Sequence, residues 1–220
     1  MSDARVTETV KKIQEDRLKY GPDQRRLQLQ VVRQLAHGHP LTAEQVEHLI
    51  ADLGIRSEAA HQFLREVTER DATDQIVGAL GLSLSRTAHR LSVAGVSFSA
   101  WCALDTLFLP TMLQQTATIE SPSPLTHHPV RLRVSPERVE EVDPETAVVS
   151  YVLVDPSREH LASVQAMWSA FCTHVHFFAS REEGEQWASG RNEIVLLTMD
   201  EGFAWGRQVW SGVFPDLYAD

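Results

Sequence analysis

Cysteine is scarce in this chain of 220 residues and occurs only at Cys102 and Cys172. Long apolar runs are also missing: no stretch of about 18 apolar residues exists, so we expect no membrane span. The first residues are charged where a signal peptide would be apolar, so we expect no secretory signal. Two cysteines without such a signal predict a reducing, cytoplasmic setting in which both are thiols.

Basic residues are few in the second half of the chain. The net charge is −10, and the whole acidic excess lies beyond residue 92. Phosphate binding needs clustered Lys and Arg, so we expect neither a nucleic-acid partner nor a membrane there. The sequence also lacks a Gly-rich phosphate loop, a serine-hydrolase elbow and a dinucleotide fingerprint.

Hydrophobic residues make up 43% of the chain, which is enough for a folded core. We expect three parts: a polar, helical N-terminal extension over 1–24, a winged-helix-like helical domain over 25–92, and a mixed α+β domain over 93–220. In the second part, apolar residues at helical spacing predict helices near 27–35, 43–53 and 57–70. Thr42 followed three residues later by Gln45 has the capping-box pattern. Two short β-like stretches follow, at 75–80 and 83–91.

A winged helix raises the alternative of a DNA-binding regulator. Its reading helix would be the third one, which carries Glu58, Glu66 and Glu69 beside Arg65 and Arg70. A reading helix normally presents Arg, Lys, Asn or Gln to the bases. The composition therefore favours a helical domain that packs on the rest of the chain.

The third part alternates between β-like and helical patterns, which predicts an α+β fold. Strands are predicted at 117–119, 130–134, 147–153, 175–179 and 194–197. Helices are predicted at 99–109 (closed by Pro110), 158–170, 181–190 and 201–214.

Cys102 and Asp105 are spaced so that they share one face of a helix. With Ser99 as N-cap, Cys102 would lie in the first helical turn, where the helix dipole favours a thiolate. Asp105 could then exchange a proton with the thiol or with its ligand. The alternative is that Cys102 is a small buried apolar residue.

Cys172, His174 and His176 alternate along the chain. If the strand at 175–179 extends back to Cys172, all three side chains point to one side. A zinc site is one alternative, although the spacing differs from common zinc motifs. Histidines on a strand are more often hydrogen-bonded core or surface groups.

Three motifs resemble one known family, in the same order and spacing. They are Trp-Cys-Ala-Leu-Asp-Thr-Leu at 101–107 followed by Pro110, Val-Ser-Pro at 134–136, and Phe-Cys-Thr-His-Val-His-Phe-Phe-Ala-Ser at 171–180 with Trp-Ala-Ser at 187–189. Together they are similar to alkylmercury (organomercurial) lyase, strongly over about 90–205 and less so over 25–90. Some members carry further cysteines, where this chain has Thr173 and, nearby, Ser123.

The resemblance implies that 93–220 is the catalytic part, with Cys102, Asp105 and Cys172 as the catalytic residues. The two thiolates would bind mercury, a soft metal, and Asp105 would protonate the carbon, giving a hydrocarbon and Hg(II). No cofactor is expected, because mercury is substrate and product. The expected partners are an organomercurial, cellular thiols and a mercuric reductase that receives Hg(II). A non-enzymatic mercury- or soft-metal-binding or sensing protein is the alternative, and it would not need the acid at Asp105.

Overall fold

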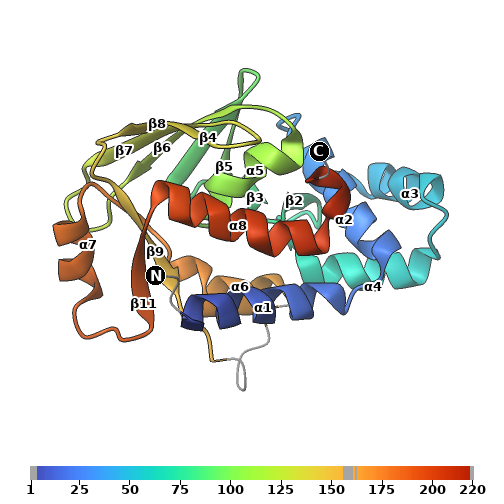
Figure 1. Cartoon of the computed structure of the whole chain (residues 1–220). Helices are drawn as coiled ribbons and strands as arrows, with labels where there is room; N and C mark the ends of the chain where they lie inside the picture. The colour runs from blue at the N-terminus through green and yellow to red at the C-terminus, as the bar shows by residue number, and fades with distance from the viewer. Residues whose placement is uncertain (1–3, 156–160, 162, 219–220) are drawn as a thin grey trace.

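The computed structural model describes residues 4–155, 161 and 163–218, and it shows a mixed α+β architecture (Figure 1). A helical N-terminal region leads into antiparallel sheets and further helices, as the sequence predicted. The helices are α1 (Ala4–Leu18), α2 (Pro22–Leu35), α3 (Ala43–Asp52), α4 (Ser57–Val67), α5 (Asp105–Leu113), α6 (Val164–Ala170), α7 (Arg181–Ala188) and α8 (Met199–Val213). Short 3₁₀ helices span Cys172–His174 and Pro215–Leu217.

The larger sheet has the strand order β1-β2-β3-β5-β4-β6-β7-β8 within the described residues, and every neighbouring pair is antiparallel. Its strands are β1 (Thr68–Arg70), β2 (Ile76–Ala79), β3 (Leu82–Ser83), β4 (His89–Val93), β5 (Val96–Ala100), β6 (Ala117–Pro122), β7 (Pro129–Val134) and β8 (Val139–Asp143). The predicted domain boundary at residue 92 falls within β4, so one sheet continues across it. The division into three parts stays a prediction.

A smaller antiparallel sheet has the order β10-β9-β11 and is formed by strands from residues 148–198. Its strands are β9 (Val148–Val152), β10 (Phe177–Phe178) and β11 (Ile194–Thr198). Every residue of β9, the central strand, is buried. Residues near β9 and β10 are therefore held in the core.

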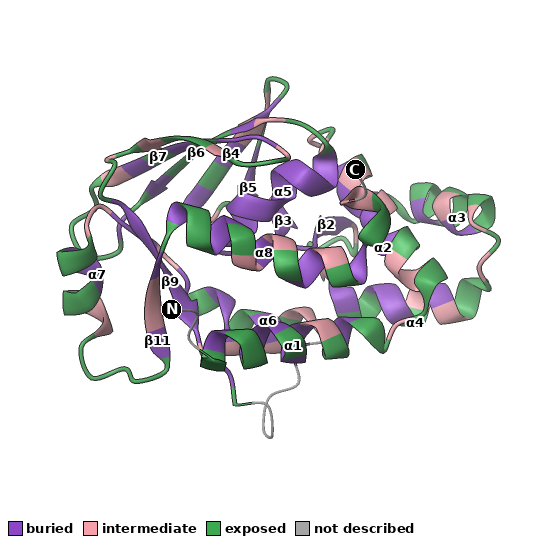
Figure 2. Cartoon of the chain, in the orientation of Figure 1, coloured by how far each residue is buried: buried purple, intermediate pink, exposed green. Residues whose placement is uncertain are grey.

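Helix α5 lies within the core, and all of its residues are buried (Figure 2). It packs against α8, and α8 in turn packs against α1 (Figure 1). Helix α8 begins with a capping box between Thr198 and Glu201, which satisfies free backbone N–H groups at its start. The predicted capping box of α3, between Thr42 and Gln45, is confirmed.

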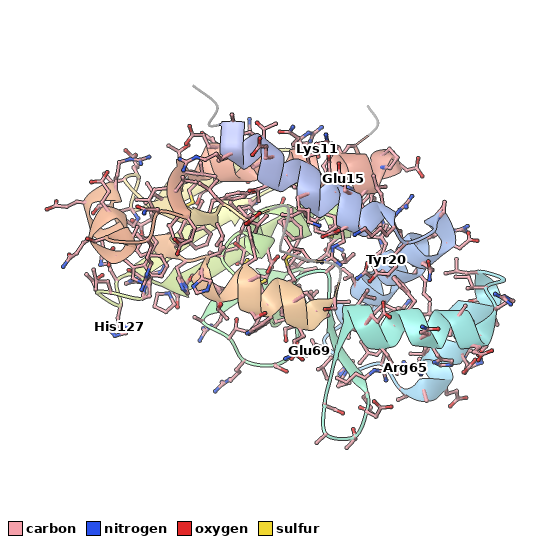
Figure 3. The ribbon with its side chains drawn as sticks, turned by 90° about the horizontal axis from the view of Figure 1, so that it is seen from below. Lys11, Glu15, Tyr20, Arg65, Glu69 and His127 are labelled. Atoms are coloured by element: carbon pink, nitrogen blue, oxygen red, sulfur yellow. The ribbon has the colours of Figure 1, made fainter. Side chains whose placement is uncertain are left out.

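Helix α1 lies along the protein with one buried face. Val6, Val10 and Ile13 are buried, whereas Lys11 and Glu15 extend from the opposite face (Figure 3). Thr9 and Asp16 accept hydrogen bonds from the backbone N–H groups of Val154 and Leu161, at 3.2 and 2.9 Å. The first helix is thus fixed to the chain that leads towards α6.

Two predictions about the region of the cysteines were wrong. Residues 99–100 end β5 instead of beginning a helix, because they pair with β3 and β4, and α5 starts only at Asp105. Pro110 lies inside α5, which ends where Gln114 adopts a left-handed φ of 55°. The predicted helix start at 158–160 lies outside the described residues, and α6 occupies 164–170. Sequence patterning also missed β8, whose residues are mostly exposed.

Among the described residues, none of the helices combines the length and the apolar character needed to cross a membrane.

Candidate active site

Two segments that lie far apart in the sequence meet beside α5. The first is the turn over 101–104 between β5 and α5, and the second is the 3₁₀ helix Cys172–His174 after α6. The backbone N–H of Ala103 donates a hydrogen bond to the carbonyl of Val175 at 3.2 Å, which joins them directly. The hydroxyl of Thr106 donates to the carbonyl of Ala103 at 2.7 Å and fixes the turn from the helix side.

These segments bring Cys102, Asp105 and Cys172 into one buried cluster. The two sulfurs and a carboxylate oxygen all lie within 4.8 Å of one another. Both cysteines are free thiols, and all three residues are at most 7% exposed. The described residues contain no other group of three His, Cys, Asp or Glu side chains arranged to hold a metal ion.

The carboxylate of Asp105 is held by two features of the backbone. The N–H of Cys102 donates to Oδ2 of Asp105 at 2.8 Å. Gly81 lies on the other side, where a Cβ atom would come within 2.6 Å of the carboxylate carbon. Gly81 also has a φ of 88°, and its carbonyl accepts from the N–H of Trp101 at 2.8 Å. Only glycine offers both the backbone conformation and the space next to the acid.

Burial changes the proton affinity of the whole cluster. It raises the pKa of Asp105 to about 6, although hydrogen bonds from Cys102 and the charge of Arg17 act in the opposite direction. Burial, the contact with Cys172 and the charge of Asp105 raise the pKa of the Cys102 thiol well above its usual value. The neighbouring Cys102 thiol lowers the pKa of Cys172, but burial and Asp105 outweigh it and leave that pKa raised. The site therefore holds two neutral thiols beside an acid that is partly protonated near neutral pH.

A small cavity of about 40 Å³ reaches this cluster, and Asp105 and Cys172 line it. Apolar side chains form much of its wall, among them Trp101, Leu104, Phe108 and Phe171. Phe177, which follows Cys172 by five residues, does not line it. Its ring is buried elsewhere, edge-on to His89.

Sequence reasoning missed two polar residues of this cavity, Arg17 and Tyr151. Arg17 is 4% exposed, its guanidinium lies 5.9 Å from the ring centroid of Trp210, and burial lowers its pKa. A signal for Arg17 was present, because it continues the buried stripe of Val6, Val10 and Ile13 at helical spacing. Tyr151 lies in β9, where the sequence predicts burial but not which face meets the cavity.

The prediction that Cys172, His174 and His176 lie on a strand and point to one side was wrong. A 3₁₀ turn replaces the strand at Cys172, which leaves His174 exposed while Cys172 is buried. His176 packs edge-on against Trp187 with ring centroids 5.2 Å apart, and its Nε2 lies 3.1 Å from the carbonyl oxygen of Thr173. Neither histidine joins the cluster, so the predicted zinc alternative loses its ligands.

Two wider hollows lie away from the thiols. One, of about 510 Å³, is bordered by Arg65 and Glu69 near the end of α4 and by Trp168 of α6 (Figure 3). Trp101, which lines the small cavity, contacts two residues of this hollow: its Nε1 donates to Glu69 at 2.9 Å, and its ring centroid lies 6.3 Å from that of Trp168.

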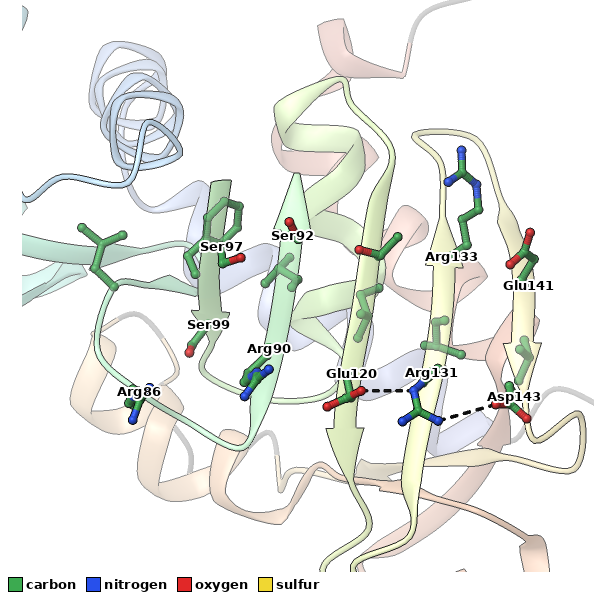
Figure 4. Close-up of a pocket in the computed structure, with 17 residues that line it drawn as sticks. Arg86, Arg90, Ser92, Ser97, Ser99, Glu120, Arg131, Arg133, Glu141 and Asp143 are labelled. Atoms are coloured by element: carbon green, nitrogen blue, oxygen red, sulfur yellow. Dashed lines mark hydrogen bonds and ion pairs between the residues drawn. The ribbon is translucent and has the colours of Figure 1, made fainter. Parts of the chain in front are cut away.

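The other hollow, of about 1040 Å³, lies on the polar face of the larger sheet (Figure 4). Arg131 bridges Glu120 and Asp143 there, at 3.1 and 3.9 Å. The described residues that line this hollow include no cysteine or histidine, which are the ligands that a soft metal prefers.

Comparison with known proteins agrees with this geometry. The family profile described as alkylmercury lyase matches residues 82–211. An alkylmercury lyase of Staphylococcus epidermidis is 39% identical over 181 residues, covering 81% of this chain and 79% of the relative. One of Pseudomonas putida is 35% identical over 188 residues, covering 84% of each.

Among solved structures, the mercury-bound form of MerB2 has the same fold, with a TM-score of 0.77 at 24% identity over 94% of this chain and 99% of that one. The match of the family profile to more than half of the chain and the identity to the curated relatives lead to one conclusion: this chain belongs to the alkylmercury lyase family.

Proposed function

We propose that this protein cleaves the carbon–mercury bond of organomercurials by protonolysis, with Cys102, Asp105 and Cys172 as the catalytic residues. The observation that carries the proposal is the buried cluster of two thiols and one acid within 4.8 Å. Mercury is soft and prefers thiolates to imidazole or carboxylate, so the sulfurs are the atoms that would bind it.

The reaction balances with the groups present in the cluster. An organomercurial R–Hg–X reacts with two thiols to give R–H, a bis-thiolate of Hg(II) and HX. One thiol proton leaves with X. The other passes through the carboxyl of Asp105 to carbon, while the electron pair of the broken carbon–mercury bond goes to the new C–H bond. The two thiolates donate electron density to mercury and make the carbon more basic.

Asp105 suits the role of proton donor because burial raises its pKa to about 6. A general acid works best when its pKa lies near the working pH. The hydrogen bond from the Cys102 N–H holds the carboxyl next to both sulfurs. A protein that only bound or sensed mercury would not need this acid, and Asp105 thus favours the enzyme over that alternative.

The test is headspace detection of methane from methylmercury with excess thiol. Wild type should release methane, whereas Cys102→Ser and Cys172→Ser should not. Asp105→Asn should retain bound organomercurial and release hydrocarbon slowly, by a factor of roughly 10² or more, since proton transfer contributes about that much. Full activity in either cysteine variant would contradict the mechanism, and binding without any methane from wild type would indicate the non-enzymatic alternative.

The surroundings of the reaction follow from the same chemistry. The reaction needs reduced thiols, which fits a cytoplasmic setting with cellular thiols present. No organic cofactor takes part. The product Hg(II), held by two sulfurs, would pass by thiol exchange to a mercuric reductase.

A further inference from the structure

The hydroxyl of Tyr151 has no hydrogen-bond partner among the described residues, although the residue is only 1% exposed. Leaving a buried hydroxyl without a partner costs free energy, and proteins keep such groups rarely. Tyr151 lines the same small cavity as Cys172 and Asp105. An unsatisfied donor at this place is suited to a ligand that enters the cavity.

The ring of Tyr151 is held in position. Its backbone lies in β9 between β10 and β11, paired with Val195. Its ring packs edge-on against Phe171, the residue before Cys172, with centroids 5.4 Å apart. Burial raises the pKa of the phenol, so the group stays neutral and able to donate. A fixed donor in the cavity that Cys172 also lines calls for an acceptor atom supplied from outside.

An organomercurial in the presence of thiols brings such an atom with it. Mercury carries the thiolate sulfur of a small thiol as its second ligand, and this sulfur accepts hydrogen bonds. Arg17, the cationic side chain that lines the cavity, favours an anionic ligand there.

We propose that Tyr151 is a substrate-binding residue whose hydroxyl donates a hydrogen bond to this leaving thiolate while Cys172 replaces it on mercury. This step rests on the function proposed above. The mercury–sulfur bond to the small thiol breaks, and a bond between mercury and the sulfur of Cys172 forms. The thiol proton of Cys172 passes to the leaving sulfur, and no atom changes its oxidation state. The hydrogen bond stabilises the negative charge that gathers on the leaving sulfur.

The experiment compares Tyr151→Phe with wild type and with the control Tyr218→Phe. Tyr218 is a second, partly buried tyrosine, and it does not line the cavity. Phenylalanine keeps the contact with Phe171 and removes only the hydroxyl. Stopped-flow tryptophan fluorescence follows capture, because Trp101 lines the cavity. The two probes are methylmercury bound to 2-mercaptoethanol and methylmercury chloride. Methane is measured separately from the loaded protein.

Tyr151→Phe should slow capture of the thiolate-bound probe by about three- to tenfold, the loss of one hydrogen bond. Capture of the chloride should change less than twofold, and so should methane release after capture. The melting temperature should be unchanged or higher, since an unsatisfied hydroxyl has been removed. Capture at the wild-type rate, an equal slowing for both probes, or an equal slowing by Tyr218→Phe would overturn the inference. Absence of methane from wild type would refute the proposed function instead, while the capture rates would still test Tyr151.

Discussion

Gly81 allows the sharpest test of how the acid is positioned. Replacing Gly81 with Ala has two effects, one on the backbone and one on the site. The backbone effect comes from the φ of 88°, a left-handed conformation that costs a residue with a Cβ about 1–2 kcal/mol. The site effect comes from the new Cβ, which would lie 2.6 Å from the carboxylate carbon and Oδ1 of Asp105. The carboxylate must therefore move.

Gly95 separates these two effects. It has a φ of 83°, but a Cβ there would meet nothing within 4 Å. Gly95→Ala should therefore show the backbone cost alone. Gly81→Ala should lose a further 1–3 kcal/mol or so of unfolding free energy, the usual cost of an overpacked site. Chemical denaturation of both variants measures the difference.

Activity should differ far more than stability. A displacement of about 1 Å at a reacting group can cost roughly 10²-fold in rate. Methane release should thus fall by about that factor in Gly81→Ala and stay near the wild-type value in Gly95→Ala. Both thiols remain in Gly81→Ala, so it should still bind mercury. Equal methane release by the two variants would refute the role assigned to Gly81.

Three further predictions concern the same cavity. Burial raises the pKa of Asp105 to about 6, so its protonated form stabilises the fold fully below about pH 4, and this contribution is lost as the pH rises through 6. Between these pH values the unfolding free energy of wild type should fall by up to about 3 kcal/mol relative to that of Asp105→Asn. Chemical denaturation at several pH values measures the difference. Ile13→Ala should lower the unfolding free energy by about 2–5 kcal/mol and enlarge the cavity that Ile13 lines. A rise in the rate of hydrocarbon release from phenylmercury relative to methylmercury would confirm the enlargement. Arg17→Leu removes a positive charge that favours the ionised forms of Asp105 and Cys172. The rate of organomercurial capture at neutral pH should therefore fall on the order of tenfold, whereas Arg17→Lys should recover most of the wild-type rate. Equal capture rates in the two variants would contradict an electrostatic role.

The sequence predicted the helices of the N-terminal part more reliably than the junction between β5 and α5. The helices at 22–35, 43–52 and 57–67 follow from apolar spacing within each segment, and the capping box of Thr42 marks the start of the second one. The start of α5 was misplaced because Ser99 is a good N-cap in isolation, while its actual state depends on pairing with Ser83 and Arg90, which are distant in sequence. Long-range pairing overrides local preference in this way wherever a strand and a helix adjoin.

The candidate site shows the same division. Cys102, Asp105 and Cys172 were predicted from motifs, but they come together only where two segments distant in sequence meet, joined by the hydrogen bond between Ala103 and Val175. No pattern in the sequence predicts that contact. Gly81 and Tyr151 were missed because their importance lies in what they approach in space.

The joining of two distant segments also affects the fate of the product. Hg(II) between Cys102 and Cys172 would close a loop of roughly 70 residues, and a covalent cross-link of that span stabilises a folded chain by about 4 kcal/mol. The protein loaded with product would then be its most heat-resistant form. Spontaneous dissociation of Hg(II) would remove that stabilisation and would therefore be unfavourable. Turnover would depend on an incoming thiol that takes the mercury from one sulfur at a time.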